Sequence, residues 1–389
     1  MDPEPQGEAR ARIESIDIVR GLVMVLMVLD HVRDHLTDTP GDPASAEHPE
    51  VGLFIARWVT HYCAPTFVFL AGTSAYLFGR TRSKAELSRF LWTRGLWLVV
   101  LEFVVVRTAW TFSLAPQMGL VGQVIWAIGV SMIVLAVLVR LPLVVSAGFG
   151  LALIFGHDLF DGLDPADFGA WRPLVQVLHV SGRTSILGLP FMVAYPLVPW
   201  IGVMATGYAA GKIYDLEPEP RSRALLGLGA ASVVAFVVVR TLNGYGDPTP
   251  WTSGDDAPET VMHWLAATKY PPSLAYLLMT LGPMLLALGA LERWPQRHLR
   301  WLLVFGRVPL FLYVVHLYLA HTIAVILGWA TGFPPGDFFT FCFGFPEGYG
   351  VSLPWVLFAW LAITAALYPA CKWYGGVKRR SRSPIFSYL

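Results

Sequence analysis

The sequence predicts an all-α membrane protein, a bundle of about ten transmembrane helices in a single domain, residues 1–389. Of its 389 residues 55% are hydrophobic and only 14% are charged, whereas about a quarter are charged in a soluble domain. The mean hydropathy is +0.55. Several apolar runs approach or exceed the roughly 20 residues that cross a bilayer. The loops between these runs also alternate in charge, as membrane topology requires.

Ten apolar segments are separated by Pro, Gly and charged residues, and each is a candidate membrane helix. A polar leader (1–14) precedes them and a basic tail (376–389) follows. The fifth segment is short for a span. The segments cover about 16–37, 53–79, 88–112, 119–139, 142–157, 186–213, 223–242, 272–292, 300–328 and 353–375.

Loop charge orients the bundle. One set of connections is basic, with Arg10, Arg12, Arg80, Arg82, Lys84, Arg89, Arg140, Lys212, Arg221, Arg223, Arg293, Arg297, Arg300, Lys378, Arg379, Arg380 and Arg382. The alternate set is acidic, with Asp38, Asp42, Glu47, Glu50, Asp158, Asp161, Asp164, Asp167, Asp247, Asp255, Asp256, Glu259, Asp337 and Glu347. Because positive loops stay in the cytoplasm, we expect a multi-pass protein of the cell membrane with both termini inside.

Charge and cysteine content exclude other classes. The formal net charge is +1, so no basic field for nucleic acid is expected. Cys63, Cys342 and Cys371 lack the spacing of a metal site, and no metal is expected. A disulfide between Cys63 and Cys342 stays open beside simple apolar packing.

The first segment carries the most informative pair of residues. Arg20 and His31 lie eleven residues apart, which is three helical turns, so both project from nearly the same face about 16 Å apart. Ionisable groups in a membrane are costly unless they face a polar interior. Asp34 is placed to orient His31, whereas Asp30 points about 100° away and is expected to pair with Arg33. The alternative is a structural hydrogen-bond network between helices.

His61 begins the second segment at about the depth that His31 reaches. Two histidines at one level could share a proton or position a nucleophile. The alternative is that His61 bonds backbone groups freed by Pro65.

Candidate substrate contacts lie on the acidic side. Lys269 and Tyr270 open the sequence Lys-Tyr-Pro-Pro before the eighth segment. Lys269 is expected to contact an anionic or sugar substrate, or else to anchor the chain at the membrane surface. Arg57 and Trp58, at the outer start of the second segment, are grouped with them.

Three arginines fall at one depth near the cytoplasmic side. These are Arg20, Arg94 and Arg307. Their guanidinium groups match phosphate oxygens, so together they form a candidate anion site. Singly, each could be a snorkelling anchor. Glu102 and Arg107 lie five residues apart in the third segment, an imperfect helical pair, so each is expected to have a partner on another helix, in a structural ion pair.

The sixth segment combines two helix signals. Pro190, Pro196 and Pro199 predict a kinked or broken helix beside a cavity. Gly207 and Gly211 form a small-xxx-small pair that predicts close helix packing.

The motifs resemble a known family over nearly the whole chain. Asp17-Ile-Val-Arg20-Gly21, Asp30-His31, His61-Tyr-Cys-Ala-Pro65, Lys269-Tyr-Pro-Pro-Ser-Leu and Gly306-Arg-Val-Pro309 resemble the bacterial branch of the heparan-α-glucosaminide N-acetyltransferase-like family, part of the transmembrane acyltransferase superfamily. The Arg-x10-His spacing is also similar to that of the O-acyltransferase branch. The resemblance implies acetyl-CoA as acyl donor, with Arg20 on its phosphates and His31 serving the transfer.

The animal lysosomal branch has an asparagine where this chain has His31, and its essential histidine lies in the following loop. By that resemblance His48, in the corresponding loop here, is a second candidate base.

The sequence therefore predicts a membrane acyltransferase. It would move an acetyl or short acyl group from cytoplasmic acyl-CoA to a hydroxyl or amine of a sugar-type or glycan-type acceptor at the outer face. His31 would act as general base, its tautomer set by Asp34 or His61, and an acyl-histidine route stays open. A homodimer is compatible with these features. The competing class is a proton-coupled or small-solute transporter with relay residues Arg20, His31, Glu102, Arg107 and His316.

Overall fold

The computed structural model describes residues 13–39, 42–43, 50–115, 118–294 and 297–381, and it is mostly helical. The α-helices are α1 (Glu14–Leu36), α2 (Val51–Thr60), α3 (Cys63–Gly79), α4 (Lys84–Leu101), α5 (Arg107–Thr111), α6 (Val124–Leu138), α7 (Leu143–Gly156), α8 (Arg172–Leu178), α9 (Leu197–Ala210), α10 (Pro218–Leu242), α11 (Ala257–Leu265), α12 (Leu274–Arg293), α13 (Leu303–Gly306), α14 (Pro309–Ala330) and α15 (Leu353–Arg380). A π-helical turn, η1 (Glu102–Val106), joins α4 to α5. Short 3₁₀ turns are η3 (His157–Phe160), η4 (Pro165–Trp171), η5 (Gly211–Asp215), η6 (Arg297–Leu302), η7 (Pro335–Phe338) and η8 (Cys342–Gly344).

A small sheet departs from the all-α prediction. Its strands are β1 (Leu120–Gly122), β2 (Gly182–Ile186) and β3 (Leu189–Val193), in the order β1-β3-β2. β3 runs parallel to β1 and antiparallel to β2. Leu187 and Gly188 both have positive φ, which suits a two-residue hairpin turn.

The strands correct two predicted spans. The segments 119–139 and 186–213 each begin in a strand, and their helices, α6 and α9, start later. The apolar run of β3 has the length of a strand, and a short run of this kind cannot be assigned from periodicity alone. Pro196 directly precedes α9, so the predicted break in the sixth segment lies at the start of its helix.

Among the described residues, six helical stretches are long and apolar enough to cross a membrane, against the ten segments expected. One of them, Val51–Gly79, changes from α2 to α3 at His61 and Tyr62. α1 is absent from the six, since it carries several charges, yet it is largely buried. The others are Leu143–Phe160, Pro218–Leu242, Leu274–Arg293, Pro309–Ala330 and Leu353–Arg380.

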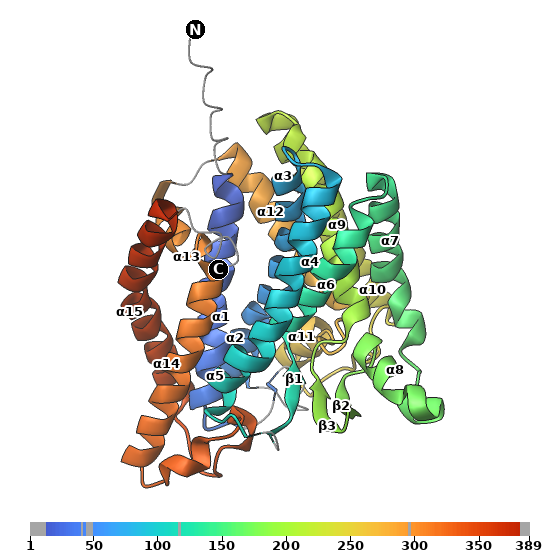
Figure 1. Cartoon of the computed structure of the whole chain (residues 1–389). Coiled ribbons are helices and arrows are strands. Elements are labelled where there is room, and N and C mark those ends of the chain that lie inside the picture. Colours follow the sequence, from blue (N-terminus) through green and yellow to red (C-terminus); the bar gives the residue numbers. More distant parts are fainter. Residues whose placement is uncertain (1–12, 40–41, 44–49, 116–117, 295–296, 382–389) are drawn as a thin grey trace.

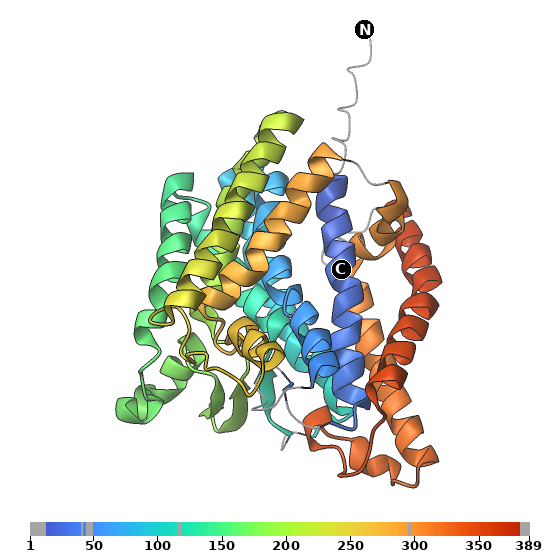
Figure 2. The same cartoon turned by 180° about the vertical axis from the view of Figure 1, so that it is seen from behind.

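α1 stands between two groups of helices (Figure 1). On one side it packs against α13, α14 and α15, and on the other against α2, α3 and α12. α3 and α4 continue this second group through α9 and α6, and α7 lies beyond α9. Seen from behind, α10 and α12 run side by side along the second group (Figure 2). Side chains of α1 therefore face both groups.

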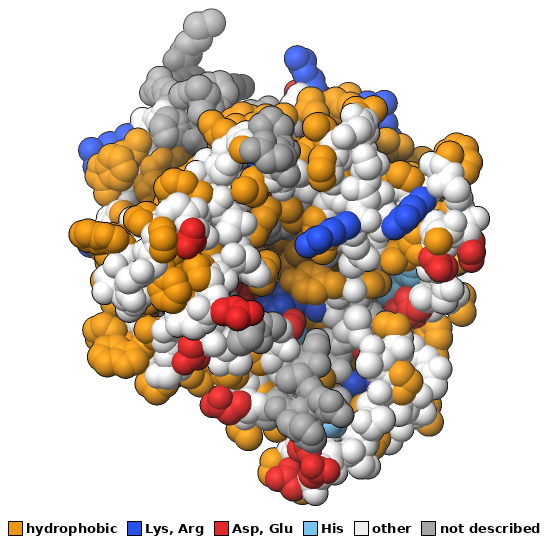
Figure 3. Space-filling model, turned by 90° about the horizontal axis from the view of Figure 1, so that it is seen from below, with side chains coloured by type: hydrophobic (Ala, Val, Ile, Leu, Met, Phe, Trp, Pro, Cys, Tyr) orange, Lys and Arg blue, Asp and Glu red, His pale blue; other side chains and the backbone are white. Residues whose placement is uncertain are grey.

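The basic connections gather at the end where α1 begins. Arg221, at the start of α10, donates to Glu292 of α12 at 3.0 Å, and Ser15 of α1 donates to the same carboxylate. Arg80, after α3, pairs with Asp215. The opposite end shows scattered acidic side chains around a central hollow that has Lys or Arg side chains at its floor (Figure 3). The bundle thus has one basic and one acidic end, as the loop charges predicted.

Close packing at Gly207 and Gly211 confirms the prediction for the sixth segment. A Cβ on Gly207 would lie 2.1 Å from the carbonyl oxygen of Phe69, and one on Gly211 would lie 2.4 Å from Cβ of Tyr76. At Gly207, α9 touches the backbone of α3, and Gly211, the first residue of η5, packs on the Tyr76 side chain of α3, contacts so close that only glycine allows them.

All three cysteines are free and buried. Sγ of Cys63 donates to the carbonyl oxygen of Val23 at 3.2 Å. The interpretation of Cys63 and Cys342 as packing residues is confirmed, and the alternative of a disulfide between them is wrong.

Candidate active site

A cavity of about 670 Å³ lies between α1, α3, α4, α6 and α14. Four cations line it, one each from α1, α4, α15 and the turn before α14. These are Arg20, Arg94, Lys378 and Arg307. The remaining lining is largely apolar and includes Met24, Met27, Phe67, Ile125, Ile128 and Tyr313. The cavity therefore combines a basic part with an apolar part.

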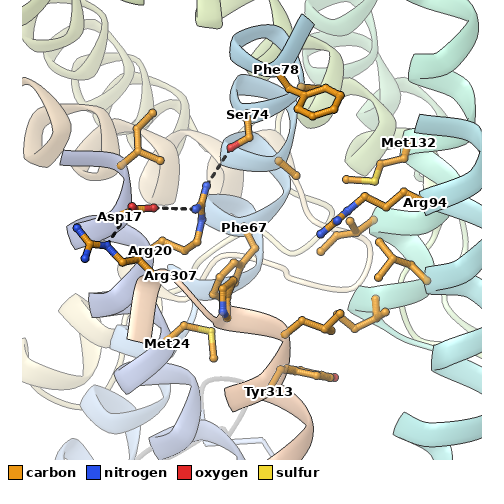
Figure 4. Close-up of a pocket in the computed structure, with 18 of the residues that line it drawn as sticks. Asp17, Arg20, Met24, Phe67, Ser74, Phe78, Arg94, Met132, Arg307 and Tyr313 are labelled. Atoms are coloured by element: carbon orange, nitrogen blue, oxygen red, sulfur yellow. Dashed lines mark hydrogen bonds and ion pairs between the residues drawn. The ribbon is translucent and has the colours of Figure 1, made fainter. Parts of the chain in front are cut away.

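Arg20 and Arg307 are held on one wall by shared polar contacts. Arg20 donates from Nη1 to Oδ1 of Asp17 at 3.1 Å and from Nη2 to Oγ of Ser74 at 2.9 Å. Nε of Arg307 lies 3.8 Å from the other oxygen of Asp17. Figure 4 shows Asp17 between the two guanidinium groups. One carboxylate thus orients both cations toward the cavity.

Two glycines allow the backbone of α1 to approach the segment that carries Arg307. A Cβ on Gly21 would lie 2.1 Å from the carbonyl oxygen of Leu302, and one on Gly306 would lie 1.9 Å from that of Asp17. α1 therefore meets the end of η6 and α13 backbone to backbone. This contact places Arg20 and Arg307, the chain neighbours of the two glycines, on the same wall.

Replacing Gly21 with valine is expected to separate α1 from α13, because a backbone carbonyl cannot yield as a side chain does. We expect a cost of about 1–3 kcal/mol from overpacking, seen as a lower melting temperature. The matched control is Gly148→Val in α7, where a Cβ would meet nothing within 4 Å. Equal melting temperatures for the two variants would contradict the packing argument.

Arg94 reaches the cavity from the opposite wall. It extends from α4 toward the side where Arg20 lies (Figure 4). Its guanidinium carbon is 5.9 Å from the ring centre of Phe90. The predicted convergence of Arg20, Arg94 and Arg307 at one depth therefore holds in three dimensions, with Lys378 as a fourth cation.

His31 lies next to the apolar part of the cavity, one helical turn after Met27 on α1. Its ring centre lies 5.9 Å from that of Tyr313, which lines the cavity, and 5.0 Å from that of Trp110. Nδ1 of His31 is 2.7 Å from Nε2 of His316 on α14. His31 is 9% exposed. The imidazole thus lies beside the apolar end of the cavity, in an aromatic cage.

A buried ion cluster lies on the other face of α1. Oδ1 of Asp30 accepts from Nη1 of Arg57 at 2.8 Å and from Thr60 at 2.7 Å, and lies 3.1 Å from Nη2 of Arg33. Its Oδ2 is 3.9 Å from Nζ of Lys269. The pairing of Asp30 with Arg33 confirms the prediction, and Asp30 joins three cations.

A family model for the catalytic domain of heparan-α-glucosaminide N-acetyltransferase matches residues 12–245. The chain belongs to this family. No curated protein matches it. The match covers α1 to α10, and hence Arg20, His31 and Arg94. Members of the heparan-α-glucosaminide N-acetyltransferase family are membrane acetyltransferases, which agrees with the apolar helices described above.

Two groups expected to orient His31 of this acetyltransferase-family chain lie elsewhere. Asp34 accepts from Arg33 at 2.5 Å, because its side chain turns to the ion cluster. Neither ring nitrogen of His61 has a hydrogen-bonding partner within the part of the chain that the structure describes, and its ring packs against Tyr276. His31 instead contacts His316, so neither Asp34 nor His61 is its partner. The alternative, in which His61 bonds backbone freed by Pro65, is not seen in the described ranges either. His48 lies outside the described residues.

The structural ion pairs expected for Glu102 and Arg107 are replaced, among the described residues, by hydrogen bonds to the backbone. Glu102 accepts from the amide of Trp126 at 2.8 Å, where a carboxylate stabilises the start of α6. Arg107 donates to the carbonyl oxygens of Gly119 and Ala115 at 2.7 and 2.5 Å. Both side chains therefore bond backbone groups.

The candidate substrate residues lie together at the acidic end. Lys269 is buried beside Tyr270, with Nζ 5.1 Å from the ring centre, so it is not a surface anchor. Arg57 also donates to Asp42, from Nε at 3.0 Å and Nη2 at 2.9 Å. Trp58 donates to the sulfur of Met279 at 3.2 Å.

Sequence reasoning missed the roles of three residues. Lys378 and Ser74 complete the basic part of the cavity. His316 was expected at mid-membrane depth, but its contact with His31 was not predicted. The two histidines are 285 positions apart in the chain. No spacing within one helix could have revealed that contact. Among the described residues, no His, Cys, Asp and Glu side chains form a group that could hold a metal.

Proposed function

We propose that the chain transfers an acetyl or short acyl group from acyl-CoA, bound in the cavity between α1 and α4, to a hydroxyl or amine of a sugar-type acceptor. The observation that carries this proposal is a cavity with four cations in one part and His31 beside its apolar end. The order of chemical groups matches acyl-CoA, which has phosphates at one end and a thioester at the other. The family match supports acetyl transfer.

The basic part would hold the nucleotide and phosphates. Arg20, Arg307 and Arg94 present guanidinium groups from two walls, and the guanidinium fork suits phosphate oxygens. Asp17 and Ser74 hold Arg20 in place before the ligand binds, which lowers the entropy lost on binding. The pantetheine arm would lie along Met24, Met27 and Phe67.

His31 would act as general base for direct transfer. It takes the proton of the acceptor hydroxyl or neutral amine as the acceptor atom attacks the thioester carbonyl carbon. The carbon–sulfur bond then breaks, and the imidazolium returns the proton to the thiolate of CoA. The net products are the acylated acceptor and CoA thiol.

A donor beside His31 would stabilise the carbonyl oxygen during attack. The hydroxyl of Tyr313 and Nε1 of Trp110 are buried and interact with each other. An indole N–H can only donate, so the Tyr313 oxygen accepts from Trp110 and the Tyr313 O–H keeps its proton to donate. A positioned donor in a dry site stabilises developing negative charge strongly. We therefore assign this role to Tyr313, held by Trp110.

The acceptor would approach from the acidic end. There Lys269 and Arg57 pair with Asp30, the neighbour of His31 in α1, with Tyr270 beside Lys269 and Trp58 next to Arg57 in α2. Charged groups and aromatic rings suit the hydroxyls and apolar faces of a sugar. We further propose that the basic end faces the cytoplasm, since positive loops stay inside.

CoA binding tests this function directly. CoA at 100 times its Kd should stabilise the purified protein by about 2.7 kcal/mol, read as a higher melting temperature, and pantetheine should stabilise it far less. Arg94→Ala should weaken CoA binding about tenfold or more, the loss of one charged hydrogen bond. Arg89→Ala, on an exposed position of the same helix, is the matched control. If neither CoA nor acetyl-CoA binds and no thiol is released from acetyl-CoA, the proposal fails.

A further inference from the structure

His31 and His316 form a hydrogen-bonded pair whose geometry determines where the protons lie. Nδ1 of His31 is 2.7 Å from Nε2 of His316, and the two ring planes are only 4° apart. One of these two nitrogens must carry the shared proton. The pair alone does not say which, because each neutral imidazole has one donor and one acceptor nitrogen.

A third group resolves the choice. Nδ1 of His316 lies 2.7 Å from the carbonyl oxygen of Leu312, one turn earlier in α14. A carbonyl oxygen can only accept, so Nδ1 of His316 carries a proton. In neutral His316, Nε2 is then the acceptor. The shared proton therefore resides on Nδ1 of His31, and Nε2 of His31 keeps its lone pair.

That lone pair is the one a base needs. Nε2 of His31 has no hydrogen-bonding partner among the residues described in the structure. The ring itself is fixed between Trp110, Tyr313 and His316, and Tyr313 lines the cavity. The base is thus held in one tautomer at the end of the acyl-donor cavity.

The usual partner for a catalytic histidine is a carboxylate, and here the nearby carboxylates are already used. Asp30 binds Arg57 and Thr60, and Asp34 binds Arg33. A neutral acceptor avoids a second buried charge in the apolar centre of the bundle. His316 can also share the positive charge when His31 takes a proton, while its Nδ1 stays bonded to Leu312.

We propose that His316 is a positioning residue that fixes His31 as the Nδ1-protonated tautomer and so presents Nε2 as the general base. This inference rests on the proposed acyltransferase function. His316 acts through His31 and touches neither CoA nor acceptor in this scheme. The contact of His316 with Leu312 is required for this role, because it places a proton on Nδ1 of His316 and leaves Nε2 as an acceptor.

Three variants separate this role from a merely structural one. His316→Leu removes the acceptor, whereas His316→Gln keeps an oxygen where Nε2 lies. His31→Ala removes the base. Acetyl-CoA consumption is followed as thiol release, with and without glucosamine as probe acceptor, and CoA binding is measured by thermal shift.

We expect kcat to fall about 10²-fold in His316→Leu, at the lower end of general-base effects, with the KM for acetyl-CoA and CoA binding little changed. His316→Gln should recover kcat to within about tenfold of the wild type, since its amide oxygen can accept from Nδ1. Wild-type kcat in His316→Leu, or no recovery in His316→Gln when both bind CoA normally, overturns the proposal.

The tautomer itself gives a readout independent of turnover. In protein labelled with ¹³C and ¹⁵N at histidine, the His31 signals, assigned by their loss in His31→Ala, should report a proton on Nδ1. In His316→Leu this tautomer should no longer dominate. A wild-type His31 protonated on Nε2 overturns the inference even if the enzyme is active. Absence of CoA binding and of thiol release in the wild type would instead overturn the proposed function.

Discussion

Replacing His31 with alanine is expected to lower acyl transfer by about 10²–10⁴-fold, the contribution of a positioned general base, while CoA still binds. His31 lies beside the apolar end of the cavity, and its contacts with Trp110, Tyr313 and His316 hold the ring in place. The CoA phosphates would lie about three helical turns away, near Arg20. The measurement is acetyl transfer from acetyl-CoA to glucosamine, with thiol release measured in parallel.

His48→Ala is the informative companion variant, because the loop histidine is the alternative base. It should retain transfer close to the wild-type rate. If His31→Ala keeps full transfer and His48→Ala abolishes it, the loop histidine is the base and the assignment of His31 is wrong.

Asp30→Ala is expected to destabilise the protein strongly, by about 3–5 kcal/mol, as when one member of a buried ion group is removed. Asp30 is the shared anion of Arg57, Arg33 and Lys269, all of which are buried. Without Asp30, these cations would lose a partner in a site with little water. We expect a markedly lower melting temperature and lower yield from membranes.

The control for this variant is Asp38→Ala, an exposed acid after the same helix, which should change stability by no more than about 0.5 kcal/mol. Adding Arg57→Met to Asp30→Ala should restore part of the melting temperature, since the two residues interact directly. Equal stability of Asp30→Ala and Asp38→Ala would show that the cluster contributes little to folding.

Local sequence patterns predicted much of the cavity that we assign to acyl-CoA. Arg20 and His31 share a helical face because eleven residues make three turns, and this holds whatever surrounds α1. Arg94 and Arg307 were placed at the depth of Arg20 by counting along their segments, and the cavity contains all three. Gly207 and Gly211 likewise predicted the contact of α9 with α3.

Predictions that needed a partner from another element failed more often. Asp34 is well spaced to orient His31, but Arg33 binds it. Glu102 and Arg107 were expected to form ion pairs, yet each bonds backbone groups instead. The strands β1 and β3 were expected as parts of helices, because short apolar runs carry no distinct period.

The sequence by itself determined that the chain is a mostly helical membrane protein with one basic and one acidic end. It also determined that Arg20 and His31 lie on one helix, three turns apart. These properties follow from composition and helical repeat, which act along the chain.

Only the tertiary structure decided which groups meet across helices. The backbone contact of Gly21 with Leu302 and of Gly306 with Asp17 brings Arg307 to Arg20, and the packing of α14 on α1 brings His316 to His31. The physical reason is that the rotation and depth of one helix against another depend on side-chain and backbone fit over the whole contact, which no short segment encodes.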